Sequence, residues 1–306
     1  MEHQQIEGTD TPRDLPPRPE APRPFTCSHC GAQASAQRRH CPACEWDLGA
    51  PNVRECTSEA ENRTLNARAN AAHTLSDTKG CSDESRSFAS LLENESGVVV
   101  TMPAAIARDL ASDPKKVFTN YERLTSSDVR LPASTHDDKR RRGVTGILFG
   151  SYADNIRYGV LSLTREGLST YGAIHCRLKA IAVAHRVSFL EDNSFTFVER
   201  HNITPGSGGP AGYRAIWSTR HLLGIAKLGA DVVRGSKAED WQRLLVCSDS
   251  VDRRNDRFIE AHIFGGFNID AVESMETVPG VKASDSATID IEIALELFNK
   301  KKGIGV

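Results

Sequence analysis

Large apolar side chains are sparse in the first 86 residues and gather into short runs from Phe88 onward. Runs that are β-branched or alternate with polar residues are typical of strands, whereas apolar residues three and four positions apart indicate helices. We therefore expect strands over residues 98–100, 143–149, 158–163, 173–178, 194–198, 244–247 and 258–264. We expect helices that begin at Pro103 and at the N-cap Ser218, and a further helix over 116–124. Over 289–301, Ile289, Ile291 and Ile293 alternate as in a strand, but Ile289, Ile293 and Leu297 share a helical face, so we favour a helix.

These patterns divide the chain into four parts. Residues 1–24 are rich in Pro, Arg and Glu, which is typical of a disordered lead segment. Residues 25–50 hold a cysteine-rich segment, and residues 51–86 have too few large apolar side chains for a core, so we expect a linker there with a helix over about 58–75. Strands and short helices without regular βαβ spacing favour an α+β domain over 87–306, with a mixed or antiparallel sheet and flanking helices.

The bulk composition limits the class of protein. The chain has 306 residues, 39% of them hydrophobic, and a formal net charge of −2, which excludes a globally basic nucleic-acid binder. The polar start, from Met1 to Gln5, predicts no signal peptide, and no apolar run approaches the roughly 18 residues of a membrane span. Half of the eight cysteines are isolated in the sequence, which favours a reducing compartment and a cytoplasmic protein.

Four cysteines between residues 25 and 50 form the strongest motif. Two Cys-x-x-Cys pairs are separated by ten residues, and their members are Cys27, Cys30, Cys41 and Cys44. Four thiolates suit one tetrahedral Zn²⁺, and each pair supplies two ligands from a tight turn. The spacing resembles a small zinc ribbon with a structural metal ion; the alternatives are two disulfides or four unrelated thiols.

A carboxylate and an imidazole mark the predicted strand over 258–264. In a strand, Glu260 and His262 point to one face, whereas Ile259, Ala261 and Ile263 point to the other. Such a pair on an apolar strand costs desolvation energy unless the two groups are bonded to each other or used in chemistry. The alternative is that this face is solvated and both side chains are simply exposed.

Two basic segments are candidates for holding an anion. Arg186 and Ser188 would share a face of an extended strand, where a guanidinium and a hydroxyl could grip phosphate. Arg142 ends a run of four cations and could reach an anionic ligand, although such a run is more often a solvated face. The glycine-rich segment 205–210 lacks the Lys-Ser/Thr of a P-loop, and neither a His-Glu-x-x-His nor a Gly-x-Ser-x-Gly motif occurs.

The stretch over about 161–272 resembles bacterial ADP-ribosyltransferase-like toxin and effector domains. The residues that carry the resemblance are Tyr171-Gly172, the segment 186–189, the turn Glu191-x-Asn193-Ser194, and the strand 258–265. The resemblance implies a split α+β sheet that holds NAD as a substrate, with a Glu that stabilises the ribosyl cation as nicotinamide leaves.

The resemblance also implies roles for individual residues. Glu260 would be the catalytic carboxylate, Ser188 the bracing hydroxyl, and His262 a residue that orients the acceptor or takes its proton. The expected cofactor-binding residues are Arg186, Arg142, Tyr171 and Asn193. This chain departs from the family two residues before Glu260, where Phe258 stands in place of the Gln or Glu of many members.

Three functions follow from these observations. The first is a cytoplasmic ADP-ribosyltransferase, a toxin or phage-defence effector with a nucleic-acid or protein acceptor and an antitoxin as a partner. The second is a non-catalytic zinc-ribbon adaptor that binds nucleic acid or protein. The third is a zinc-ribbon nuclease that uses His and Glu with an added metal ion. Convergence of Glu260, Ser188 and an Arg in one cleft would favour the enzyme.

Overall fold

The computed structural model describes residues 24–119, 135–248, 255–281 and 284–303. The expected lead segment over 1–24, apart from its last residue, and most of the helix expected over 116–124 lie outside these ranges. The described helices are α1 (Pro51–Glu55), α2 (Glu59–Thr78), α3 (Ser82–Asn94), α4 (Ala104–Ser112), α6 (Thr135–Phe149), α7 (Ala180–Val183), α8 (Ser194–Arg200), α9 (Arg220–Leu228), α10 (Ala238–Leu245) and α11 (Asp285–Lys302). None of them is long and apolar enough to cross a membrane.

The strands form one large sheet and two small ones. Their bounds are β1 (Pro24–Thr26), β2 (Gln33–Ser35), β3 (Gly97–Met102), β4 (Ile156–Ser162), β5 (Ile174–Leu178), β6 (Val187–Leu190), β7 (Arg214–Ile216), β8 (Val246–Cys247), β9 (Arg257–Phe258), β10 (Glu260–Phe264) and β11 (Val272–Thr277). The large sheet has seven strands in the order β11-β5-β3-β4-β10-β6-β7, and every neighbouring pair is antiparallel. An antiparallel sheet with flanking helices is therefore present, as the strand pattern predicts.

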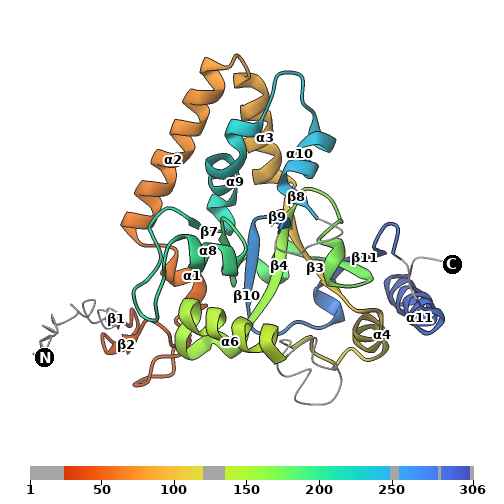
Figure 1. Cartoon of the computed structure of the whole chain (residues 1–306). Coiled ribbons are helices and arrows are strands. Elements are labelled where there is room, and N and C mark those ends of the chain that lie inside the picture. The colour runs from red at the N-terminus through yellow and green to blue at the C-terminus, as the bar shows by residue number, and fades with distance from the viewer. Residues whose placement is uncertain (1–23, 120–134, 249–254, 282–283, 304–306) are drawn as a thin grey trace, which may run out of the picture.

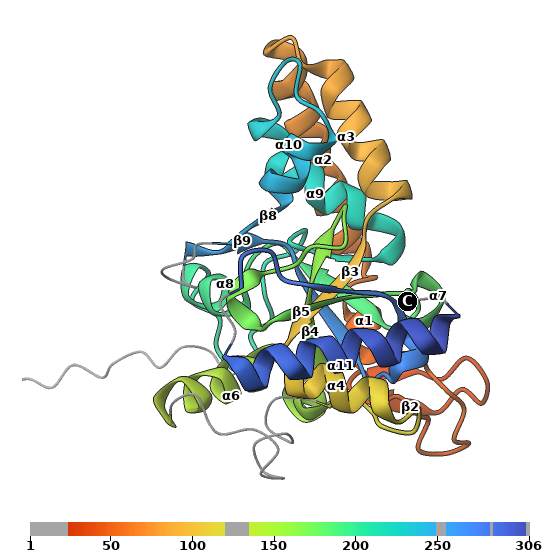
Figure 2. The ribbon, with the colours of Figure 1, turned by 90° about the vertical axis from the view of Figure 1, so that its right-hand side faces the viewer.

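Helices cover the sheet from several sides. α2, α3, α9 and α10 stand together beyond one end of the strands, and α6 lies at the other end (Figure 1). α11 runs alongside α4 (Figure 2), and the small strands β1 and β2 lie at the foot of the molecule near α1 (Figure 1). The predicted helices at Pro103 and over 289–301 are confirmed as α4 and α11.

Each strand separates an apolar face from a more polar one. On the first face, alternate residues of five strands join the main core, among them Val98, Val100, Cys176, Phe189 and Ala261. On the opposite face, alternation places Thr101, Tyr158, His175, Ser188, Glu260 and His262. The predicted division of β10 is confirmed, because Ile259, Ala261 and Ile263 lie in the main core.

Two predicted strands are helices instead. Residues 143–149 belong to α6, where Val144, Ile147 and Leu148 pack together at helical spacing. Residues 194–198 begin α8, whose buried Ser194, Phe197 and Val198 recur at the same spacing. Both short apolar runs fit either period, and the side chains three and four residues apart decide the outcome.

Other expected elements differ in position. Residues 116–119 are not helical in the described part of the chain; Phe118 forms a β-bridge with Phe267 instead. Residues 244–245 end α10, so the strand there is limited to β8. The N-cap position of α9 is Thr219 and not Ser218, and both residues belong to the 3₁₀ turn Trp217–Thr219.

The segment expected to be a linker, 51–86, is helical and packed. The helix predicted over about 58–75 is confirmed as α2, with Ser58 as its N-cap. Leu65 and Ala69 of α2 are buried in the main core with Phe88 of α3. Glu61 accepts hydrogen bonds from the Arg214 guanidinium, which ties α2 to β7. Few large apolar side chains are enough here, because α2 buries a narrow stripe between α3 and α9.

Candidate functional site

Four cysteine sulphurs meet at the turns that follow β1 and precede α1. Their Sγ atoms lie within 4.8 Å of one another, and the Cys27–Cys44 and Cys30–Cys41 pairs are 3.8 and 3.7 Å apart. A tetrahedral ion with Zn–S bonds of about 2.3 Å would set its sulphurs about 3.8 Å apart. None of the eight cysteines forms a disulfide. The cluster, Cys27, Cys30, Cys41 and Cys44, therefore fits a structural zinc ion.

The two turns that supply the ligands have the same backbone form. The N–H of Gly31 donates to the carbonyl of Cys27, and the N–H of Glu45 donates to that of Cys41. Both donors lie in the left-handed region, with φ of 73° for Gly31 and 58° for Glu45. Glycine adopts this conformation without strain, whereas Glu45 holds it at a cost.

The backbone and the neighbouring thiols set the acidity of two ligands. The Ala43 N–H lowers the pKa of the Cys41 thiol to about 7. The Trp46 N–H lowers the pKa of the Cys44 thiol, but burial and the adjacent cysteines outweigh it and raise this pKa to about 12. Because zinc binds thiolates, occupation of this site must release protons, Cys44's above all.

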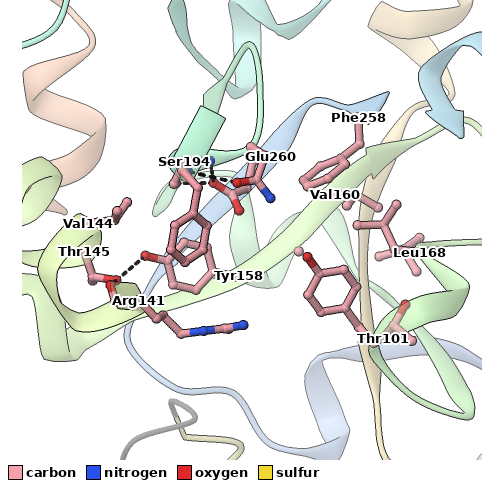
Figure 3. A pocket seen from close by; sticks show the side chains of 15 residues that line it. Thr101, Arg141, Val144, Thr145, Tyr158, Val160, Leu168, Ser194, Phe258 and Glu260 are labelled. Atoms are coloured by element: carbon pink, nitrogen blue, oxygen red, sulfur yellow. Dashed lines mark hydrogen bonds between the residues drawn. The ribbon is translucent and has the colours of Figure 1, made fainter. Parts of the chain in front are cut away.

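A second site lies on the polar face of the large sheet. A pocket of about 80 Å³ opens between β3, β4, β10, the middle of α6 and the start of α8. The polar side chains around it include Thr101, Arg141, Tyr158, Ser194 and Glu260 (Figure 3), together with Tyr171. An enclosed cavity of roughly 150 Å³ holds one benzene ring, so this pocket encloses only part of a ring, and the rest of a ligand would lie on its open side.

Glu260 is buried at this pocket and held on one oxygen. Glu260 is 7% exposed, and its Oε2 accepts a hydrogen bond from the Ser194 backbone N–H at 2.9 Å. The Ser194 hydroxyl also donates to Oε2 (Figure 3). The Nε2 of His262 lies 3.0 Å from the same oxygen. Every hydrogen bond that the structure describes for this carboxylate goes to Oε2. A carboxylate fixed in this way cannot turn away as a ligand enters.

His262 lies behind Glu260 and is only 3% exposed. Its ring meets the edges of Phe149 and Tyr158, with centroids 4.8 and 5.4 Å away. The solvated face that the sequence left open as an alternative is therefore absent at both residues. This burial places His262 as a support for Glu260 and away from the pocket wall.

The elements around Glu260 are tied together by one amine. Lys227 of α9 donates from Nζ to the carbonyl of Glu191 at 2.6 Å and to that of Phe258 at 2.7 Å. These carbonyls lie shortly before Ser194 and Glu260, so Lys227 bridges the two segments that lead to them, in addition to the pairing of β6 with β10. Burial lowers the pKa of Lys227, while Asp192 and Glu191 raise it.

Two expected anion-binding residues have structural partners. The Arg186 guanidinium donates to the carbonyls of Ala182, Phe264 and Gly266, which joins the turn before β6 to the end of β10. The Ser188 hydroxyl accepts from the Nδ2 of Asn52 at 3.0 Å. The hydroxyl that contacts Glu260 is that of Ser194, six residues later.

The remaining expected residues are near the pocket. Tyr171 and Asn193 line it, and the Asn193 side chain also caps α8 by accepting from the Phe195 N–H at 2.8 Å. Arg142 is exposed on α6, whereas Arg141 lines the pocket. The helical conformation explains this difference. Arg141, Val144 and Thr145 are three and four residues apart and share one face of α6, whereas a strand would place Val144 on the face opposite Arg141 and Thr145.

Sequence reasoning missed several pocket residues. Thr145 donates to the Arg141 carbonyl and is 2.8 Å from the Tyr158 hydroxyl, which fixes α6 against β4. Thr101 lies 2.9 Å from the Nδ1 of His175, whose pKa burial lowers to about 4. The helical spacing of residues 141, 144 and 145 is a signal that could have identified this face of α6.

The three residues that the sequence expected in one cleft do not all meet there. Glu260 and Arg141 line the same pocket, whereas Ser188 is not among its lining residues and a different serine, Ser194, contacts Glu260. Within the described part of the chain, the cysteine cluster is the group of His, Cys, Asp and Glu residues suited to a metal ion, so the nuclease hypothesis lacks a metal site there. Comparison with models of known protein families and with curated protein sequences finds no match to this chain.

Proposed function

We propose that this chain is an ADP-ribosyltransferase-like enzyme that transfers ADP-ribose from NAD to a macromolecular acceptor. The observation that carries the proposal is the buried Glu260, held by Ser194 and His262 at a pocket that also contains Arg141. A positive charge that develops on ribose needs one fixed carboxylate close by. Aromatic side chains around the same pocket, Tyr158, Tyr171, Phe195 and Phe258, suit a planar nicotinamide ring.

The proposed reaction assigns a task to each group. The bond between ribose C1′ and the nicotinamide nitrogen breaks, and its electron pair leaves with nicotinamide. Glu260 stabilises the ribosyl cation through Oε1 while Ser194 and His262 hold Oε2. Arg141 supplies positive charge for the phosphates that lie outside the small pocket. The acceptor then bonds to C1′ and loses its proton to water.

Release of nicotinamide from NAD tests this proposal. Glu260→Gln is nearly isosteric and removes the charge, so the rate should fall by roughly 10²-fold or more while the protein stays folded. Ser194→Ala should lower the rate less, because the Ser194 N–H and His262 still hold Oε2. Glu292→Gln, an exposed change on α11, is the matched control and should keep full activity. Wild-type protein that neither binds nor consumes NAD would contradict the proposal.

A second candidate is the non-catalytic adaptor, favoured by one observation. Trp46 is 50% exposed beside the cysteine cluster, and its ring stacks on His29 with centroids 4.5 Å apart. Exposed aromatic rings of this kind stack on unpaired bases. Quenching of tryptophan fluorescence by a single-stranded oligonucleotide, lost in Trp46→Phe, would support this function; an unchanged signal would remove it.

A further inference from the structure

The cysteine ribbon, residues 25–50, is joined to the large sheet through the short helix α1. Arg54 of α1 donates to four carbonyls of the ribbon: those of Ala36, Arg38, Leu48 and Gly49, at 2.5–3.1 Å. Its guanidinium also lies 4.9 Å above the Phe25 ring. These carbonyls flank the second pair of cysteines on both sides. Arg54 therefore ties α1 to the folded ribbon, while the packing of Val53 and a hydrogen bond from Tyr152 to Glu55 hold α1 on the other side.

The opposite side of α1 contacts the strand that carries Glu260. Asn52 is 2% exposed, and its Nδ2 donates to the carbonyl of His262 at 2.8 Å and to the Ser188 hydroxyl at 3.0 Å. It also lies 3.3 Å from the carbonyl of Arg186. Ser188 is the register partner of His262 across β6 and β10. One amide therefore joins both strands at the residue that supports Glu260.

α1 has little stability of its own. It has five residues, whereas isolated helices shorter than about 12 residues are marginal in water. Small cysteine-ligated domains are commonly unfolded without their metal ion. If the four cysteines lose zinc, the carbonyls that hold Arg54 lose their fixed arrangement. Asn52 would then lose the part of its support against β6 and β10 that comes through Arg54.

We propose that Asn52 is a positioning residue for Glu260 and His262, and that the metal-loaded ribbon keeps it in place through Arg54. Loss of zinc from the ribbon then loosens the Glu260 site. The catalytic consequence rests on the proposed function, whereas the positioning of His262 is measured without NAD. The ribbon is by this inference a part of the site's support and not a separate tethered module.

The ring signal of His262 in a proton–carbon NMR spectrum tests the proposal. It is assigned by its absence in His262→Gln, and the His175 signal, absent in His175→Gln, is an internal control from β5 on the same face of the sheet. Zinc is removed from the full chain with EDTA and restored with zinc chloride. The His262 signal should move by more than its line width, the His175 signal should stay, and zinc should restore the first spectrum.

Variants then separate coupling from general loosening. Asn52→Ala should move the His262 signal in the same direction as zinc removal, and zinc removal from Asn52→Ala should add little, because both act through one contact. If Asn52→Ala fails to fold, Arg54→Lys takes its place. A lysine offers fewer donors to the four carbonyls, so this variant should shift the His262 signal in the same direction by a smaller amount. Gln37→Ala removes the ribbon's bonds to Ser151 and should leave His262 unchanged.

Specific results would overturn the proposal. One is a His262 signal that stays in place when zinc is removed and the ribbon signals collapse; another is a His175 shift as large as that of His262. Fully additive effects of Asn52→Ala and zinc removal would also overturn it. If NAD is consumed, Asn52→Ala should lower kcat by roughly tenfold with little change in KM. If NAD is not consumed by any form, the proposed function fails, and the His262 signal still decides the positioning.

Discussion

Replacement of Leu65 by alanine should destabilise the whole main domain. Leu65 lies in α2 and is 1% exposed within the core that also contains Phe88, Leu92 and Leu223. The change removes three buried carbon groups at about 0.8 kcal/mol each, or about 2.4 kcal/mol. The cavity left behind adds to this loss, so the free energy of unfolding should fall by about 2–5 kcal/mol.

The same substitution elsewhere on α2 is the matched control. Leu75 is 43% exposed, so Leu75→Ala should cost less than about 1 kcal/mol. Both variants have the same helix and the same change in helix propensity, and they differ mainly in the burial of the leucine.

Urea unfolding followed by tryptophan fluorescence measures both variants. Trp241 packs against Phe88 at 5.6 Å in the same core, so it reports on the unfolding of this region. The Leu65→Ala midpoint should fall well below that of Leu75→Ala with an unchanged slope. Equal midpoints for the two variants would refute the reasoning and return residues 51–86 to the role of a linker.

Three further predictions concern other parts of the molecule. Purified protein should contain about one zinc ion. Its zinc affinity should fall as the pH is lowered, because Cys44, with a pKa near 12, must lose its proton on binding. Titration with a chelator measures this affinity, and an affinity that does not change with pH would contradict the prediction. Burial lowers the pKa of His175 to about 4, so the unfolded chain binds a proton below about pH 6.5 that the folded chain does not. The free energy of unfolding should therefore decline from pH 6.5 to 4 by up to about 3 kcal/mol, and this decline should be smaller in His175→Gln. Gly172→Ala would place a Cβ 2.2 Å from the carbonyl carbon of Met102, so it should lower the unfolding midpoint, and an unchanged midpoint would show that the two segments part easily.

Local patterns in the sequence predict much of the fold. Alternation in β10 is sufficient to place Glu260 and His262 on the face opposite Ala261, because successive strand residues point to opposite sides whatever the strand pairs with. The spacing of Cys27, Cys30, Cys41 and Cys44 likewise predicts a metal cluster, since each pair closes its own turn.

Short apolar runs limit this kind of prediction. Residues 143–149 and 194–198 have too few positions to separate a period of 2 from one of 3.6, and both were wrongly predicted as strands. Arg142 was also the expected anion-binding residue, whereas Arg141 is the arginine that lines the pocket. The linker prediction failed for a related reason: the burial of Leu65 depends on α9, a helix far away in the chain.

The candidate site depends on contacts between distant residues. Ser194 and Glu260 are 66 positions apart, and Asn52 and His262 are 210 positions apart. No local period records which hydroxyl or amide will meet a given carboxylate or carbonyl. Those partners are selected when the antiparallel sheet brings β4, β6 and β10 together and the helices pack on them, because only then do burial and hydrogen-bond geometry act on residues from separate segments.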